Sequence, residues 1–246
     1  MTRVGAMDGA LVLAGVLVIW QGLFLYAGDV AITPPGRTIA FAVELLGRGA
    51  FWGHAGATFG AFVSALAISA VGGVALGLVL GLRRFAGDVI EPVLASFYTV
   101  PKVTLYPVML LVFGLGPSAK VAFGVIHGLI PITLFTLAAV KSMPPVLLRT
   151  ARALRLGPGQ VLVRVLAPAV LPEIVTGLRV GVALTMLGVL IGEMFASQRG
   201  LGFLIINGIN SHDVRMTTTV AMLVVVFAVS LNGALLMAER GRRVSS

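Results

Sequence analysis

Long runs of apolar residues, separated by short polar connections, extend along almost the whole chain. A helix needs about 20 such residues to cross the hydrocarbon core of a bilayer. The pattern therefore predicts six membrane-spanning helices, the third of them interrupted by prolines and centred on 103–113, with the others at residues 9–27, 59–82, 119–140, 173–195 and 216–238. We also expect short helices at the membrane surface at 37–46 and 89–98, and a polar loop at 196–215.

The first apolar run could also be a signal peptide, because Arg3 precedes it. The run is longer than the usual apolar core of a signal peptide, and no small-residue cleavage site follows it. A retained membrane helix is therefore the favoured interpretation.

The composition agrees with this pattern. Of the 246 residues, 58% are hydrophobic and only 11% are charged, against about 25% charged in soluble domains. We expect a single all-α integral membrane domain, residues 1–246, in contact with the lipid bilayer. The absence of cysteine excludes disulfides and thiolate metal sites. The net charge of +9 does not predict a nucleic-acid partner, because the basic residues are dispersed between the spans.

The distribution of Lys and Arg predicts the orientation in the membrane. Six spans place both termini on one side, together with thirteen of the 18 basic residues: Arg3, Arg83, Arg84, Lys102, Lys141, Arg149, Arg152, Arg155, Arg164, Arg179, Arg240, Arg242 and Arg243. The other side receives Arg37, Arg48, Lys120, Arg199 and Arg215. Cytoplasmic loops carry the excess of basic residues, so both termini are expected in the cytoplasm.

Motifs of intrinsic enzymes are missing. The chain contains no G-x-x-x-x-G-K-[ST] phosphate loop, no H-E-x-x-H and no G-x-S-x-G. His54, His127 and His212 lie in different segments, so neither a metal site nor another cofactor is expected in this chain. The energy for any work must then come from a gradient or from another subunit.

Two ionisable residues inside predicted spans are candidates for a translocation pathway, because such residues are costly in hydrocarbon. His127 could instead be a neutral imidazole bonded to a neighbouring helix, and Glu193 could form an ion pair with Arg199 near the outer surface. Small residues at four-residue spacing predict close helix packing, within one subunit or between subunits, at Gly73, Gly77, Gly81, Gly177 and Gly181.

The most polar long stretch of the second half is the loop 143–172. Pro144 and Pro145 favour a helix start, and residues 146–156 then predict a short basic helix with its arginines largely on one face. Gly157 follows in a helix-breaking Gly-Pro-Gly, and Pro168 lies in a second short segment that leads into the fifth span. The spacing alone is equally compatible with binding phospholipid and with docking a protein.

The segment RTARALRLGPGQVLVRVLAPAVLP resembles the cytoplasmic coupling loop of permease subunits of bacterial ABC importers, closest to the nitrate, sulfonate and taurine branch. The agreeing positions are Ala151, Arg152, Ala153, Leu154, Gln160, Val161, Leu162, Arg164, Val165, Pro168, Ala169, Leu171 and Pro172. TPPGRTIAFAVELL, TVPKVTLYPVMLLVFGLGPSAKVAF and GEMFASQRGLGFLI are similar to further segments of the same branch, so the resemblance covers nearly the whole chain.

The resemblance implies a six-span, type I ABC importer permease with a MetI-like fold, located in the bacterial inner membrane. The implied partners are a second permease copy, two cytoplasmic ATP-binding subunits that hold ATP and magnesium, and a periplasmic or lipid-anchored substrate-binding protein. The implied substrate is a small anion such as nitrate, a sulfonate or taurine, with a vitamin or a pyrimidine precursor as the alternative. A gradient-driven secondary transporter and a non-transporting anchoring subunit are the rival functions.

The same resemblance assigns the coupling to the ATPase to Arg149, Ala151, Arg152, Ala153, Leu154, Arg155, Gly157, Gln160, Arg164 and Pro168. Two of these positions depart from the family pattern: Arg149 replaces an acidic residue and Arg155 replaces a glycine. The reversed charge implies either an ATPase with a complementary acidic groove or weakened coupling. We expect Gly157 to supply the flexibility that the missing glycine would have given.

Overall fold

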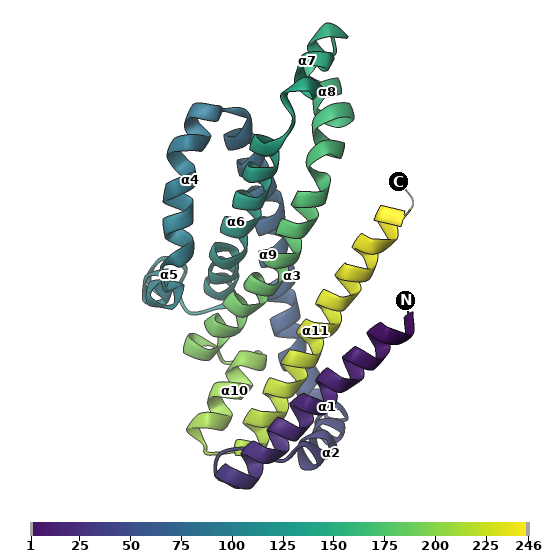
Figure 1. Ribbon diagram of the computed structural model, residues 1–246. Helices are drawn as coiled ribbons and strands as arrows, with labels where there is room; N and C mark the ends of the chain where they lie inside the picture. The colour runs from purple at the N-terminus through teal and green to yellow at the C-terminus, as the bar shows by residue number, and fades with distance from the viewer. Residues whose placement is uncertain (1, 245–246) are drawn as a thin grey trace.

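The computed structural model describes residues 2–244, and the side chains in this range except those of 2–6, 148, 158, 196 and 238–244. Arg3, Arg240, Arg242 and Arg243, which the orientation argument includes, therefore lie outside the described side chains. Every regular element in the described range is helical, which confirms the all-α class (Figure 1). The elements are α1 Thr2–Ala27, α2 Pro35–Leu46, α3 Gly49–Leu82, α4 Arg84–Thr99, η1 Lys102–Leu105, α5 Tyr106–Phe113, α6 Pro117–Ser142, α7 Pro145–Ala153, α8 Pro158–Val161, η2 Leu162–Leu166, α9 Ala167–Ala196, α10 Leu201–Asn210 and α11 Val214–Val244.

Five predicted spans correspond to helices that are long and apolar enough to cross a membrane: Met7–Ala27, Gly49–Leu82, Pro117–Ser142, Gly159–Phe195 and Val214–Met237. The sixth is a bent pair, in which Arg84–Thr99 and Lys102–Phe113 meet at 92°. The prediction of six spans therefore holds when this pair is counted as one broken span.

The third span differs from the prediction in shape. α5 has eight residues and a length of about 12 Å, which is too short to cross the hydrocarbon core alone. α4 does not lie flat at the surface as expected for 89–98; it runs along the bundle and contacts α6 (Figure 1). Pro101 precedes the bend with an extended backbone, and its missing N–H ends the helical hydrogen bonding there.

Close contacts between α3, α6 and α9 form the centre of the molecule. A Cβ atom added to Gly73, Gly77 or Gly81 of α3 would lie 2.5–2.8 Å from α6, against Ile132, Thr136 and Val140 respectively. On α9, a Cβ at Gly177 would lie 2.6 Å from Phe135, and one at Gly181 would lie 2.5 Å from Ile132. All five small positions therefore serve packing within this chain.

Two helical segments extend beyond the predicted boundaries. The expected polar loop 196–215 contains α10, because LGFLIINGIN is apolar enough to pack on α9 and α11. The fifth span begins fourteen residues before the predicted 173, at Gly159, and includes the π-helical turn η2. Pro168 and Pro172 follow this turn. Proline has no N–H to donate to the carbonyl four residues before it, and the wider π-helical turn accommodates this gap in the hydrogen bonding.

The two ends of the bundle carry different elements. Figure 1 shows α7 at one end and α2 and α10 at the other. The first turn of α1 and the last turn of α11 both point toward the α7 end (Figure 1). The described part of α1 contacts the rest of the chain mainly through α2, and its apolar window has no buried residue, so it is free to face lipid.

Candidate functional site

The loop that connects α6 to α9 forms a projecting elbow at one end of the molecule. Pro144 is extended and Pro145 begins α7, where its missing N–H costs no hydrogen bond. The helix ends at Ala153, three residues before the predicted end at 156. Leu154 then leaves the helix and Arg155 turns the chain with a φ of +52°.

The elbow exposes almost all of its surface. Ala151 is the buried residue of the described part of α7, at 1% exposure, and α7 contacts η2. Val146 and Leu154 are 60% and 66% exposed although they are apolar. A short helix with exposed apolar and basic side chains, held at one buried point, is typical of a surface that another protein covers.

The structure brings the residues assigned to coupling onto this elbow, but it does not gather them into one pocket. Apart from the buried Ala151, the side chains are exposed at Arg149, Arg152, Ala153, Leu154, Arg155, Gly157, Gln160, Arg164 and Pro168. Gln160 accepts a hydrogen bond from the backbone N–H of Gly157 at 3.2 Å, which fixes the start of α8.

Gly157 is not the residue that turns the chain in the elbow. The residue with left-handed backbone in the elbow is Arg155, at the position where the family pattern has glycine. Gly157 has no positive φ, and a Cβ there would meet nothing within 4 Å. A non-glycine residue in the left-handed region costs about 1–2 kcal/mol, so this chain retains the turn in spite of Arg155.

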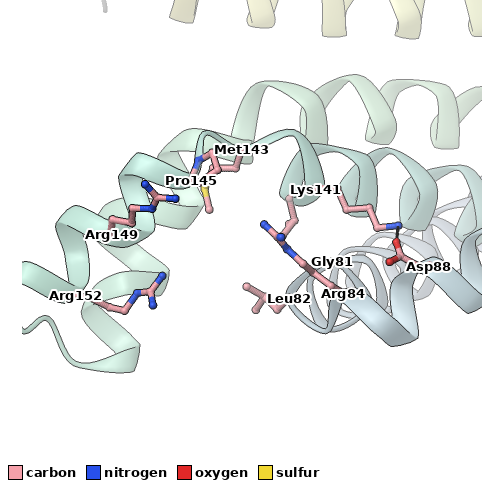
Figure 2. A pocket seen from close by; sticks show the side chains of 10 residues that line it. Gly81, Leu82, Arg84, Asp88, Lys141, Met143, Pro145, Arg149 and Arg152 are labelled. Atoms are coloured by element: carbon pink, nitrogen blue, oxygen red, sulfur yellow. Dashed lines mark hydrogen bonds and ion pairs between the residues drawn. The ribbon is translucent and has the colours of Figure 1, made fainter.

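A basic cavity of about 640 Å³ lies between α7 and the turn that joins α3 to α4. Figure 2 shows Arg149 and Arg152 projecting into it from α7, with Arg84 approaching from the opposite wall. Lys141 points away toward Asp88, with which it forms an ion pair at 2.5 Å, and a second pair at 2.7 Å joins it to Glu91. We call this space, lined also by Gly81, Leu82, Val140, Met143 and Pro145, the basic cavity.

Glu193 has a different position from the expected one. It is fully buried at the C-terminal part of α9, and its partner is Lys120 of α6, at 3.3 Å, instead of Arg199. Its other carboxylate oxygen accepts hydrogen bonds from the hydroxyl of Thr58 at 2.7 Å and from the N–H of Gly202 at 3.0 Å. Burial in an apolar bundle requires this full set of donors, because a lone carboxylate would be strongly destabilising.

Further contacts bind the α9–α10 connection to the same carboxylate. Lys120 also donates to the Ser197 hydroxyl at 3.0 Å and to the backbone carbonyl of Arg199 at 2.9 Å. A Cβ at Gly200 would collide with the Glu193 carboxylate, so only glycine fits there. We call this group the Glu193 cluster: Thr58, Lys120, Glu193, Ser197, Gly200 and Gly202. It joins α3, α6, α9 and α10.

His127 lies inside α6 and is 7% exposed. Its Nδ1 is 2.8 Å from the carbonyl oxygen of Phe123, so it bonds its own helix and not a neighbouring one. The ring packs over Gly188 of α9, where a Cβ would lie 2.9 Å from it. In this chain the residue therefore fills a helix interface.

Sequence reasoning missed the long-range partners at both ends. The sequence places Lys120 on the outer side, yet its charge opposite Glu193 in the neighbouring span is a signal for a pair. From the sequence, Arg84 and Lys141 indicate only the orientation, although both lie beside the elbow in the structure. No group of three or more metal-ligating side chains is present among the described residues.

A family comparison decides the class of protein. The model of the family described as "Binding-protein-dependent transport system inner membrane component" matches residues 73–243, which include the elbow and the Glu193 cluster except Thr58. The chain belongs to this family. It is therefore the multi-pass inner-membrane permease component of a transport system whose ATP hydrolysis takes place in a separate subunit.

Several known permeases are similar to the chain. It is 28% identical to the taurine transport system permease protein of Escherichia coli over 200 residues, 78% of this chain and 73% of that protein. It is 26% identical to the putative aliphatic sulfonates transport permease protein of Bacillus subtilis over 230 residues, 92% and 82% of the two chains. It is 32% identical to the riboflavin transport system permease protein of Chloroflexus aurantiacus over 191 residues, 77% and 71% of the chains.

These findings confirm the ABC importer permease predicted from the coupling loop. Membership of a binding-protein-dependent transport family implies an ATP-binding partner and a substrate-binding partner. The gradient-driven alternative does not fit this family.

Proposed function

We propose that two copies of this chain form the translocation pathway of an ATP-driven importer, with the α7 elbow as the contact for an ATP-binding subunit on each copy. The observation that supports the proposal is the elbow itself, an exposed helix in which Ala151 is the one buried residue among the described side chains. α6 and α9, which flank the elbow, make extensive contacts with each other and with α3. A displacement of α7 would therefore move the packed centre of the bundle.

We place α7 and both termini in the cytoplasm. The positive-inside rule favours this orientation, because the basic residues of α7, η2 and the α3–α4 turn lie at one end. Basic residues of the opposite end have acidic neighbours: Arg37 pairs with Asp29 at 2.9 Å, and Arg215 with Glu44 at 3.4 Å. The substrate-binding protein would approach this second end.

The reversed charge at Arg149 supports an ATP-binding subunit with an acidic groove. Arg149 is exposed on α7, and a carboxylate is the natural partner of its planar guanidinium. A guanidinium docked without a partner would cost several kcal/mol, so the ATPase should supply the carboxylate.

The coupling is tested in proteoliposomes that contain the permease, its ATPase and its binding protein. Arg149→Glu should lower ATP-driven uptake at least about tenfold, since it places a carboxylate against an acidic groove. ATP hydrolysis should persist without uptake. Arg83→Glu, the same charge reversal at an exposed site outside α7, is the matched control and should transport normally.

Undiminished uptake by Arg149→Glu would refute the role of the elbow. An absence of uptake by the unmodified complex, with hydrolysis intact, would instead support a subunit that only anchors its partners.

For the substrate we propose a small anion of the taurine, sulfonate or nitrate type. The names of the taurine and aliphatic sulfonate relatives support this class. The riboflavin relative favours a vitamin as the second candidate. Calorimetric titration of the cognate binding protein with taurine, nitrate and riboflavin separates the two, because only the true class should bind at micromolar concentration.

A further inference from the structure

Helix α4 is held to the rest of the chain at few points. All of its residues are described, and Gly87 is the only buried one. The apolar side chains of Val89, Val93 and Phe97 are each 50–53% exposed. In a bilayer such side chains gain little from packing against another helix, so they do not fix the position of α4. The contacts near Gly87 therefore determine where this end of α4 lies.

These contacts come from the end of α3 and from α6. A Cβ at Gly87 would lie 2.6 Å from the carbonyl oxygen of Leu80 and 3.3 Å from Cε of Lys141, so α4 approaches both helices closely there. The ammonium group of Lys141 forms an ion pair with Asp88 at 2.5 Å (Figure 2), and a second one with Glu91 at 2.7 Å. Asp88 and Glu91 are three positions apart and share one face of α4, so a single cation joins both to α6.

Lys141 belongs to the base of the elbow. It lies in the last turn of α6, and the chain leaves this helix at Met143, two residues before α7 begins at Pro145. Val140 and Met143 are buried in one apolar cluster with Leu166 of η2, on the other side of the elbow. A displacement of α7 would therefore move Lys141 together with this cluster.

The opposite end of the α4–α5 unit is attached to α9. After the bend of 92°, Tyr106 begins α5, is 3% exposed and donates a hydrogen bond from its hydroxyl to the carbonyl of Gly192 at 2.7 Å. A Cβ at Gly192 would lie 3.1 Å from Lys120, which pairs with Glu193. The unit therefore has one attachment at the base of the elbow and another beside the Glu193 cluster, with a largely exposed helix between them.

We propose that Lys141 is a positioning residue for transport. Its ion pairs with Asp88 and Glu91 make α4 follow the elbow, and the α4–α5 unit then turns about the contact of Tyr106 with α9. The ATP-binding subunit in this way moves the third span, which is not adjacent to the elbow in the sequence. The inference rests on the proposed function, because it takes α7 as the contact for that subunit.

A purely structural ion pair is the competing explanation. The side chain of Lys141 is 24% exposed, and those of Asp88 and Glu91 are 69% and 41% exposed. Ion pairs this accessible to water contribute little to stability. Their loss should therefore reduce coupling much more than it reduces the melting temperature. A second alternative is that the two carboxylates bind the ATP-binding subunit directly, and retention of that subunit by the variants distinguishes this case.

The test uses proteoliposomes that contain the permease, its ATPase and its binding protein. Lys141→Gln should lower the uptake per ATP hydrolysed at least about fivefold, a loss in the range for residues that carry coupling between sites. Its Tm should change by less than about 4 °C, and the ATP-binding subunits should be retained. Asp88→Asn combined with Glu91→Gln removes the same pairs from the other side and should give the same loss.

Two further variants serve as controls. Lys141→Arg keeps a cation opposite both carboxylates and should retain at least about half of the uptake. Glu173→Gln makes the acid-to-amide change on α9, where Glu173 is exposed and forms no ion pair with the described side chains, so it should transport normally.

Hydrogen exchange with and without a non-hydrolysable ATP analogue measures whether α4 follows the elbow. In the unmodified complex the analogue should change exchange both in α7 and at 89–99 of α4. In Lys141→Gln the change in α7 should persist and the change in α4 should disappear. A purely structural pair would not give this result, because its loss would raise exchange in α4 equally with and without the analogue.

Undiminished uptake by Lys141→Gln would overturn the inference, and so would an α4 response to the analogue that persists in this variant. Loss of the ATP-binding subunits from the variant without the two carboxylates would assign Asp88 and Glu91 to docking instead. If the analogue left α7 itself unchanged in the unmodified complex, the proposed function would fail, and this inference with it.

Discussion

The two ends of this permease differ in how their charged side chains are paired. In the Glu193 cluster, one carboxylate is fully buried, and Lys120, Thr58 and Gly202 all donate to it. At the α7 elbow the charges are exposed, and Arg84 and Arg149 face an open cavity without an ion pair to the described side chains. The Glu193 carboxylate finds its donors within the chain, whereas the arginines at the α7 end require a partner outside it. The difference suggests that one end is built to keep its shape and the other to respond.

The comparison is tested most strongly by Glu193→Ala. The change leaves the ammonium group of Lys120 buried without its carboxylate, and breaking a buried pair in this way costs about 3–5 kcal/mol. We expect a loss of that size in the free energy of unfolding, measured by SDS titration in mixed micelles. Glu193→Leu combined with Lys120→Met should recover at least half of the loss. A single variant as stable as the original would show that the cluster is not a structural anchor.

Gly200→Ala and Gly157→Ala compare the same substitution at the two ends. Gly200 has a φ of +129°, and its added Cβ would collide with the Glu193 carboxylate, so we expect a loss of about 2–5 kcal/mol. Gly157 has room for a Cβ and ordinary backbone, so its variant should stay within about 0.5 kcal/mol. Melting temperatures of both variants in detergent would measure the contrast. Equal melting temperatures would contradict it.

The centre of the bundle is expected to lose stability when a packed glycine is substituted, as the Glu193 end is. Gly77→Ala would place its Cβ 2.5 Å from Thr136, and overpacking of this kind costs about 1–3 kcal/mol. Gly60→Ala on the same helix meets nothing within 4 Å, so it should be neutral or stabilising by up to about 1 kcal/mol. Unfolding of both variants by SDS titration tests this pair. A neutral Gly77→Ala would mean that α3 and α6 can separate without cost.

Much of the fold could be predicted because apolar run length and glycine spacing are local signals. The runs located five spans, since only a membrane accommodates so much apolar surface, and Gly73, Gly77 and Gly81 marked the face of α3 that contacts α6. The bend after α4 could not be predicted. Prolines allow it, but its geometry depends on distant contacts such as the hydrogen bond of 2.7 Å from the Tyr106 hydroxyl to the carbonyl of Gly192.

The position of the elbow in the chain could be predicted from the sequence, but the residues that lie beside it in space could not. The run of arginines and prolines identified 143–172, whereas the basic cavity depends on Arg84, which is 65 positions before Arg149 in the chain. Lys120 and Glu193 are similarly separated, by 73 positions, and Arg199 was a closer candidate in sequence. Pairs of this kind follow from helix packing and not from spacing.

The smallest expected effect concerns the turn that ends α7. Arg155 has left-handed backbone with a φ of +52°, and the N–H of the next residue, Leu156, bonds the carbonyl of Ala151 at 3.0 Å. Arg155→Gly removes the conformational cost and should stabilise this turn by about 1 kcal/mol. Local stability is the relevant quantity, because an exposed elbow opens without unfolding the bundle.

Hydrogen exchange of the α7 amides measures this local stability. About 1 kcal/mol should slow exchange at Leu154 and Leu156 roughly fivefold in Arg155→Gly, because their N–H groups close the turn. Arg155→Ala keeps the Cβ and removes the charge, so it should not slow exchange. Slowing in both variants would attribute the effect to charge repulsion among the arginines. Faster exchange in Arg155→Gly would show that the Arg155 side chain itself stabilises the turn. The elbow would then depend more on contacts within the chain than the contrast with the Glu193 cluster implies.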